Sequence, residues 1–183
     1  MFADVTGGTD AAVAADAFAF RVHFEVWLLV ALVIAMGVYV VRVIGPKVVP
    51  EGEPVITRRQ RNWFIAGVFT LWLASDFPLH DLSERYLYSL HMVQHMVLTF
   101  VMAPMFWLAM PEWLARLLVP TGGTGYNVLK RLAKPVVAGL IFNGVVAVTH
   151  WSVIVNTSAR IGAFHYVAHV IVVSSALIMW LPV

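Results

Sequence analysis

The 183-residue chain contains no cysteine and few charged residues. The absence of cysteine excludes disulfide bonds and thiolate metal sites, so a soft metal ion could be bound only through histidine and methionine. Charged residues make up 12% of the chain, whereas 61% of the residues are hydrophobic and the mean hydropathy is +0.83. This balance is typical of an integral membrane protein rather than of a soluble domain.

The first twenty residues contain three aspartates and no lysine or arginine, so they lack the basic start of a cleaved signal peptide. The apolar runs that follow predict an all-α integral membrane protein, a bundle of about five transmembrane helices that forms a single domain over residues 1–183. The predicted spans cover about 22–44, 62–79, 84–110, 135–155 and 161–182. A loop is expected over 45–61, a kink near Pro104, and a short interfacial helix over 111–119.

The direction of the spans follows from the distribution of the basic residues. One side of the predicted membrane has nine of them: Arg42, Lys47, Arg58, Arg59, Arg61, Arg116, Lys130, Arg131 and Lys134. The other side has only Arg21, Arg85 and Arg160. Because cytoplasmic loops carry an excess of lysine and arginine, the N-terminus is predicted to lie outside. The basic residues are explained by this topology and give no support to nucleic-acid binding.

With this topology, all seven histidines fall in the outer half of the predicted bundle. His91 and His95 are four residues apart and share one face of a helix, and His165 and His169 repeat this spacing. His150 lies near the outer end of the span between the two pairs. Ionisable side chains are costly inside a bilayer and indicate a functional site.

The cluster admits several interpretations. For His23 we prefer a structural role, as a hydrogen-bonding group between helices, or a simple position at the membrane interface. For His80 a functional role and simple exposure in a loop are equally favoured. For His91, His95, His150, His165 and His169, shared binding of a metal ion or a proton path is favoured, because the spans offer few polar partners for five imidazoles. Neutral imidazole suits copper, zinc and iron, and two pairs plus His150 could supply three to four ligands and an open position.

Other classes of site fit the pattern less well. No glutamate follows His91, which excludes the HExxH pattern of zinc hydrolases. Haem is a rival, because histidines on two helices of a bundle can ligate it axially. A membrane di-iron oxygenase normally has adjacent histidine pairs, and this chain has none. Accessory roles are open for His80, Asp76 and Asp81 as outer partners, and for Met92 and Met96 as thioether ligands, although methionines at helical spacing are usually packing residues.

Several motifs, in order along the chain, resemble the CtaG family, the multi-span bacterial assembly factors of cytochrome c oxidase. The motifs are Ser75–Asp81, Tyr88–His95, Ala103-Pro104, Met110–Leu114, Pro135, Phe142-Asn143, Thr149-His150-Trp151 and His165–His169. The resemblance covers about residues 62–183, and the first span fits more loosely. Family members usually continue past the motif Trp180-Leu-Pro182 with further spans, which leaves open a site completed by helices beyond this chain.

The resemblance implies a multi-pass protein of the bacterial plasma membrane that helps to build a copper centre of the oxidase. Its partners would be oxidase subunits and the lipid bilayer, and no enzymatic turnover is expected. A haem b-binding cytochrome and a permanent structural subunit of a respiratory complex are the alternatives. Cu(I) is expected rather than zinc, because Cu(I) accepts two or three imidazoles at low coordination number, while catalytic zinc commonly adds a carboxylate or thiolate.

Overall fold

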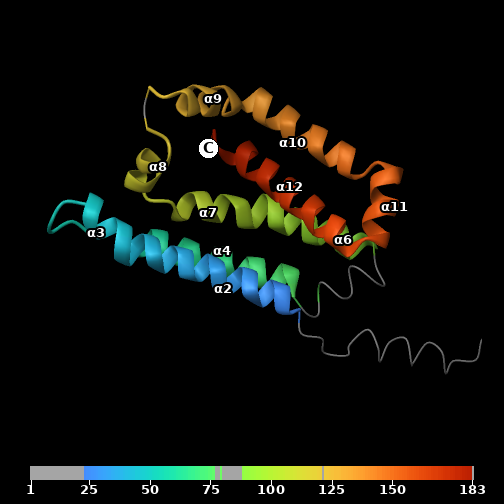
Figure 1. Cartoon of the computed structure of the whole chain (residues 1–183), viewed down its shortest axis with the longest axis horizontal. Helices are drawn as coiled ribbons and strands as arrows, with labels where there is room; N and C mark the ends of the chain where they lie inside the picture. The colour runs from blue at the N-terminus through green and yellow to red at the C-terminus, as the bar shows by residue number, and fades with distance from the viewer. Residues whose placement is uncertain (1–22, 77–78, 80–87, 121, 183) are drawn as a thin grey trace, which may run out of the picture.

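The computed structural model describes residues 23–76, 79, 88–120 and 122–182, and every regular element within these ranges is helical. The long helices form a row in which each packs against the next (Figure 1). Helix α2 (Phe24–Tyr39) lies on α4 (Arg58–Ser75), and α4 lies on the central helix of residues 88–109. That helix contacts α12 (Gly162–Trp180), which packs against α10 (Pro135–Thr149). The all-α prediction is therefore confirmed.

The first span extends further than the sequence predicted. Helix α2 continues through a π-helical segment, η1 (Val40–Ile44), into α3 (Gly45–Val48), and the whole run covers Phe24–Val48. The prediction that a loop begins at residue 45 is wrong. A proline has no N–H for the carbonyl four residues before it, but a π-helix pairs each carbonyl with the fifth residue onward. The carbonyl of Arg42 can thus pair with the Lys47 N–H instead of Pro46, and the helix continues.

The central helix accommodates its proline in the same way. It consists of α6 (Tyr88–Met96), the π-helical segment η2 (Val97–Met102) and α7 (Ala103–Ala109). Pro104 stands in the first turn of α7, directly after the π-helical segment. The carbonyl of Phe100 can therefore pair with Met105 instead of the proline. The irregularity expected at Pro104 is a change of helix type, and residues 80–87 of the predicted span lie outside the described ranges.

Helix α4 is shifted by four residues from the predicted range 62–79. It begins after Thr57, whose hydroxyl accepts from the Gln60 N–H while the Gln60 side chain accepts from the Thr57 N–H. This reciprocal cap fixes the earlier start, which the hydrophobic pattern could not show. The helix ends at Ser75, where Asp76 takes an extended conformation. The buried face of α4 forms the main core with α2 and the central helix, through Val26, Val30, Val68, Leu71, Ala74, Leu98 and Met102.

The predicted span 135–155 is divided in two. Helix α10 ends at Thr149, and a separate helix α11 (Ser152–Arg160) follows. The Thr149 hydroxyl donates to the Val145 and Val146 carbonyls, and the Nδ1 atom of His150 donates to Val146 as well. The Val146 carbonyl also keeps its helical bond to the His150 N–H, and the helix ends where the Trp151 N–H bonds the Val148 carbonyl, three residues back. The single span to residue 155 is therefore corrected to a helix, a break and a second helix.

Two short helices connect the central helix to α10. Helix α8 (Glu112–Leu118) confirms the short helix expected over 111–119, and α9 (Thr124–Leu132) precedes α10 at an angle of 77°.

Helix α12 is held to the central helix by two indoles. The Trp107 N–H donates to the Leu177 carbonyl over 2.9 Å, and the Trp180 N–H donates to the Thr99 carbonyl over the same distance.

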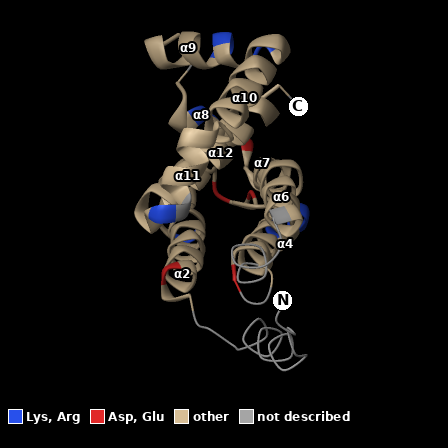
Figure 2. Ribbon diagram, turned by 90° about the vertical axis from the view of Figure 1, so that its right-hand side faces the viewer, with Lys and Arg blue, Asp and Glu red and all other residues tan. Residues whose placement is uncertain are grey.

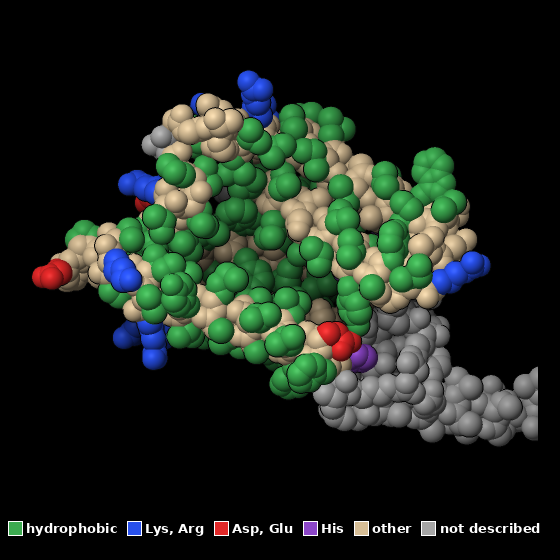
Figure 3. Space-filling view, viewed as in Figure 1, with side chains coloured by type: hydrophobic (Ala, Val, Ile, Leu, Met, Phe, Trp, Pro, Cys, Tyr) green, Lys and Arg blue, Asp and Glu red, His purple; other side chains and the backbone are tan. Residues whose placement is uncertain are grey.

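Three described helices are long and apolar enough to cross a membrane: Phe24–Val48, Ser89–Ala109 and Gly162–Trp180. A fourth is possible if α9 and α10 form one bent span. The surface is correspondingly apolar, with Phe24 74% exposed and Val136 73% exposed. Hydrophobic side chains dominate the face around a central hollow (Figure 3), and charged positions are few (Figure 2). Such a surface is suited to lipid or to apolar partners rather than to water.

Candidate metal centre

The histidines come from three helices whose ends lie together at one end of the helix bundle. Helix α6, the first segment of the central helix, carries His91 and His95, and α12 carries His165 and His169 in its first half. His150 directly follows the end of α10. The starts of α6 and α12 and the junction of α10 with α11 lie together in Figure 1. Chain direction therefore brings together side chains that are up to 78 residues apart in sequence, from 91 to 169.

In each i, i+4 pair the two imidazole rings contact each other through their Nε2 nitrogens. The Nε2 atoms of His91 and His95 are 2.9 Å apart, and those of His165 and His169 are also 2.9 Å apart. At this distance one ring donates a hydrogen bond to the other, and the tautomers decide the direction. The spacing in the sequence thus produces the shared helix faces that it predicted.

The two pairs meet across the interface between α6 and α12. The rings of His95 and His169 stack with their centroids 4.5 Å apart and their planes inclined by 11°. His91 adds edge contacts to His169 at 5.5 Å and a tilted contact to His165 at 5.7 Å. One ligand atom from each of His91, His95 and His169 lies within 4.8 Å of the others. We call these three residues the histidine triad.

Two hydrogen bonds orient the flanking rings. The Nδ1 atom of His165 is 2.9 Å from the hydroxyl oxygen of Ser158, and Nδ1 of His150 is 2.8 Å from the Val146 carbonyl oxygen. The ring of His150 lies 5.9 Å from that of His95 between centroids. Outer partners of this kind fix the tautomer and direction of a ligating histidine. Sequence reasoning missed Ser158 and Val146, because nothing in their spacing marks either of them.

The suggested acidic accessory residues are only partly described. Asp76 is buried, at 3% exposure, and its Oδ2 atom accepts a hydrogen bond of 3.0 Å from the Trp72 indole. Its Oδ1 atom has no hydrogen-bond partner among the described residues. Within the part of the chain that the structure describes, the Asp76 carboxylate forms no hydrogen bond with a histidine ring. His80 and Asp81 lie outside the described residues.

The suggested methionines and His23 are not among the three residues whose ligand atoms converge. Met96 is 59% exposed, so its side chain lies at the surface, and Met92 is half-buried. His23 lies 3.7 Å from the carboxylate of Glu25, which also accepts a hydrogen bond of 2.6 Å from the Tyr166 hydroxyl. This arrangement suits the structural role that we expected for His23.

The chemistry of the centre follows from its donor set. The triad offers imidazole nitrogens, with no carboxylate among the three side chains, and its rings are half-buried. Neutral imidazoles bind borderline and soft cations such as copper and zinc. Binding of a cation is thus the simplest chemistry that the triad supports.

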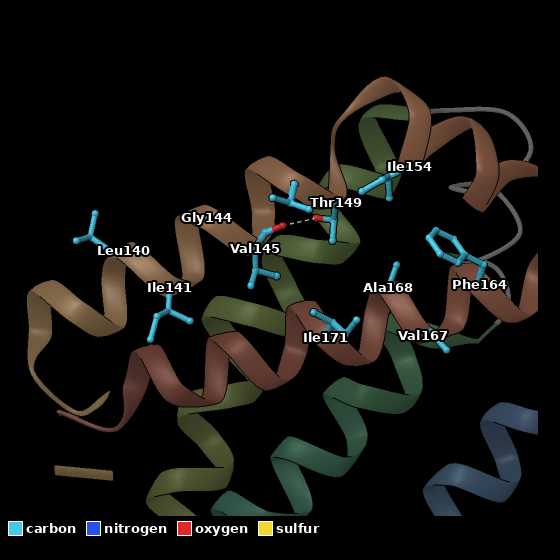
Figure 4. A pocket seen from close by; sticks show the side chains of 11 residues that line it. Leu140, Ile141, Gly144, Val145, Thr149, Ile154, Phe164, Val167, Ala168 and Ile171 are labelled. Atoms are coloured by element: carbon cyan, nitrogen blue, oxygen red, sulfur yellow. Dashed lines mark hydrogen bonds between the residues drawn. The ribbon is translucent and has the colours of Figure 1, made fainter. Parts of the chain in front are cut away.

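A separate apolar cavity is formed by residues of α10, α11 and α12. It has a volume of about 440 Å³, with Leu140, Val148, Phe164 and Ile171 among its lining residues. The Thr149 hydroxyl is its main polar group and is bonded to the Val145 carbonyl (Figure 4). None of the five clustered histidines lines this cavity. It is therefore distinct from the metal centre.

The apolar helices and the half-buried imidazoles together define a helical membrane protein with a histidine-lined centre. Residues 35–183 match the family model of the cytochrome c oxidase caa3 assembly factor (Caa3_CtaG), and the chain belongs to this family. The family resemblance of the sequence is confirmed, and the match begins within the first span, ahead of residue 62. No curated protein and no solved structure matched the chain.

Proposed function

We propose that this chain assists assembly of cytochrome c oxidase by carrying Cu(I) on its histidine centre. The single observation that supports this role most strongly is the meeting of His91, His95 and His169 with ligand atoms within 4.8 Å. Membership of the assembly-factor family supports a role in oxidase assembly, and the imidazole donor set supports copper as the ion that is carried. An assembly role needs no turnover, so we expect binding and release of an ion rather than catalysis.

Copper fits the donor set better than the alternatives. Catalytic zinc sites commonly include a carboxylate or thiolate ligand, and the triad has neither. Haem would need a planar slot between its axial histidines, whereas the rings of His95 and His169 stack directly at 4.5 Å. Cu(I) accepts two or three imidazoles at low coordination number, which matches three converging rings.

The centre is proposed to face the outside of the bacterial plasma membrane. Nine of the ten described lysines and arginines belong to segments at the end of the helix bundle where α3, α8 and α9 lie, whereas Arg160 lies on α11 at the other end. The positive-inside rule then places the histidine end outside and the N-terminus with it. In this arrangement α4 and the bent pair α9–α10 complete five spans in one domain.

The proposed partners are subunits of the oxidase that receives copper. A membrane carrier must release its ion, so the ligands should exchange readily and be reachable from the outer side. A permanent subunit of a respiratory complex would instead remain bound after assembly. Copurification with the mature oxidase would favour the permanent role, and its loss on maturation would favour the carrier.

The direct test is anaerobic Cu(I) titration of the purified protein against a coloured chelator. We expect one Cu(I) per chain for the wild type and loss of this binding for His169→Ala. Absorption spectra of the same sample exclude or reveal haem through the Soret band. A wild-type protein that takes up no copper, or that purifies with a Soret band, would refute the proposal.

A further inference from the structure

His150 differs from the other four clustered histidines in what fixes its ring. Its Nδ1 atom is 2.8 Å from the Val146 carbonyl oxygen. A carbonyl oxygen can only accept, so Nδ1 must carry the proton of the neutral ring. The lone pair then belongs to Nε2, which is the form that binds metal ions. Nε2 of His150, at the end of α10, is therefore a ligand atom that does not have to lose a proton before it binds a metal ion.

The position of His150 places it beside the triad rather than within it. Of the other four clustered rings, only that of His95 contacts it, at 5.9 Å between centroids. His95 contacts its triad partners His91 and His169 at 4.5 Å each. His150 also adjoins the surface, because Trp151 next to it is 66% exposed and begins the break before α11. His150 therefore lies between the triad and the exposed junction of α10 and α11.

We propose that His150 is a transfer ligand for the copper ion, an inference that rests on the function proposed above. The triad holds Cu(I) at rest. During release, a bond forms between Cu(I) and Nε2 of His150 while a bond between Cu(I) and a triad nitrogen breaks. The oxidation state stays Cu(I), and no proton moves, because Nε2 carries none. Low coordination number leaves room for the incoming imidazole before another departs.

Two substitutions separate the ligand role of His150 from its role at the helix end. His150→Asn keeps a side chain that can donate to the Val146 carbonyl but removes the imidazole ligand. His150→Met supplies a thioether that binds Cu(I) but cannot form that hydrogen bond. Thr149→Val is the matched local control, because it removes the neighbouring hydroxyl bonds to Val145 and Val146 and leaves the ring.

The experiment loads each purified protein with Cu(I) anaerobically and follows transfer to excess bicinchoninate by stopped flow. We expect His150→Asn to keep the wild-type stoichiometry but to transfer copper more slowly by about tenfold, the effect of about 1.4 kcal/mol on a barrier. His150→Met should recover part of the rate, and Thr149→Val should match the wild type.

Three results would overturn the inference while the proposed function stands. His150→Asn could transfer as fast as the wild type, which would make the ring structural. It could lose the copper, which would make His150 a resting ligand. His150→Met could be as slow as His150→Asn, which would show that a side chain able to bind Cu(I) at this position does not speed transfer. Failure of the wild type to bind copper would instead refute the proposed function itself.

Discussion

His95 and His169 are 74 residues apart in the chain, from 95 to 169, yet their imidazoles stack at 4.5 Å with an angle of 11° between the rings. Helix α6 supplies one ring and α12 the other. Parallel, contacting imidazoles can share a cation only if their nitrogens also converge, and the ligand atoms of both rings lie within 4.8 Å of that of His91. The geometry links the two motifs into one unit.

The first prediction concerns the ligands. His91→Ala and His95→Ala should each abolish stoichiometric Cu(I) binding, because each removes one of three triad ligands, and loss of a side chain in a half-buried cluster leaves the helices intact. Copper content by elemental analysis and helicity by far-ultraviolet circular dichroism check both parts. His23→Ala is the control, because that ring faces Glu25 at 3.7 Å, outside the triad. Full copper binding by His91→Ala would contradict the assignment.

The second prediction concerns pH. Protons and metal ions compete for the same imidazole nitrogens, so Cu(I) affinity should fall as pH drops below about 6.5, the value for free histidine. The sign follows from linkage, because metal binding releases the protons that the free ligands carry at low pH. For three ligands, log affinity should gain up to about three units per pH unit at low pH. An affinity independent of pH from 5 to 8 would argue against imidazole ligands.

The third prediction concerns the packing of α2 on α4. A Cβ atom added at Gly37 would lie 2.5 Å from the ring of Phe64. Gly37→Ala should therefore lower the free energy of unfolding by about 1–3 kcal/mol, the usual cost of overpacking. Gly144→Ala is the matched control, since nothing lies within 4 Å of its added Cβ atom, and alanine favours helix over glycine by up to about 1 kcal/mol. Thermal unfolding in detergent compares the two, and equal stabilities would contradict the packing.

The sequence was sufficient for the parts of the centre that depend on helical periodicity. The spacings His91–His95 and His165–His169 place each pair on one helix face, and alternating spans bring both faces to one end. The described structure agrees with these expectations: the ring contacts link both pairs, and His150 contacts His95. The ligand roles of these residues stay a prediction until metal binding is measured.

Features that depend on local hydrogen bonds could not be derived from hydrophobicity. The break after Thr149 is marked by a change of backbone partner, because the Trp151 N–H turns back to the Val148 carbonyl within a run whose apolar character continues. The π-helical segments before Pro46 and Pro104 likewise depend on a change of carbonyl partner. Both effects shift element boundaries by several residues while the apolar pattern stays the same.

The fourth prediction concerns the indole that ties α12 to the central helix. Trp180→Phe removes the N–H that donates to the Thr99 carbonyl over 2.9 Å and keeps most of the ring volume. The free energy of unfolding should fall by about 1 kcal/mol, the net value of one such bond. Trp151→Phe is the control because Trp151 is 66% exposed and immediately precedes α11. Equal loss of stability in both variants would assign the effect to ring size.

The last prediction concerns topology, and the absence of cysteine makes it directly measurable. Glu53→Cys places a thiol in the exposed turn between α3 and α4, and Val153→Cys places one on α11, where Val153 is 68% exposed. If the basic end is cytoplasmic, an impermeant maleimide added to intact cells should label Val153→Cys and leave Glu53→Cys unlabelled. Permeabilised cells should show both thiols labelled, which controls for accessibility. Labelling of Glu53→Cys in intact cells would reverse the orientation and place the histidine centre on the cytoplasmic side, where a copper donor would have to be sought instead.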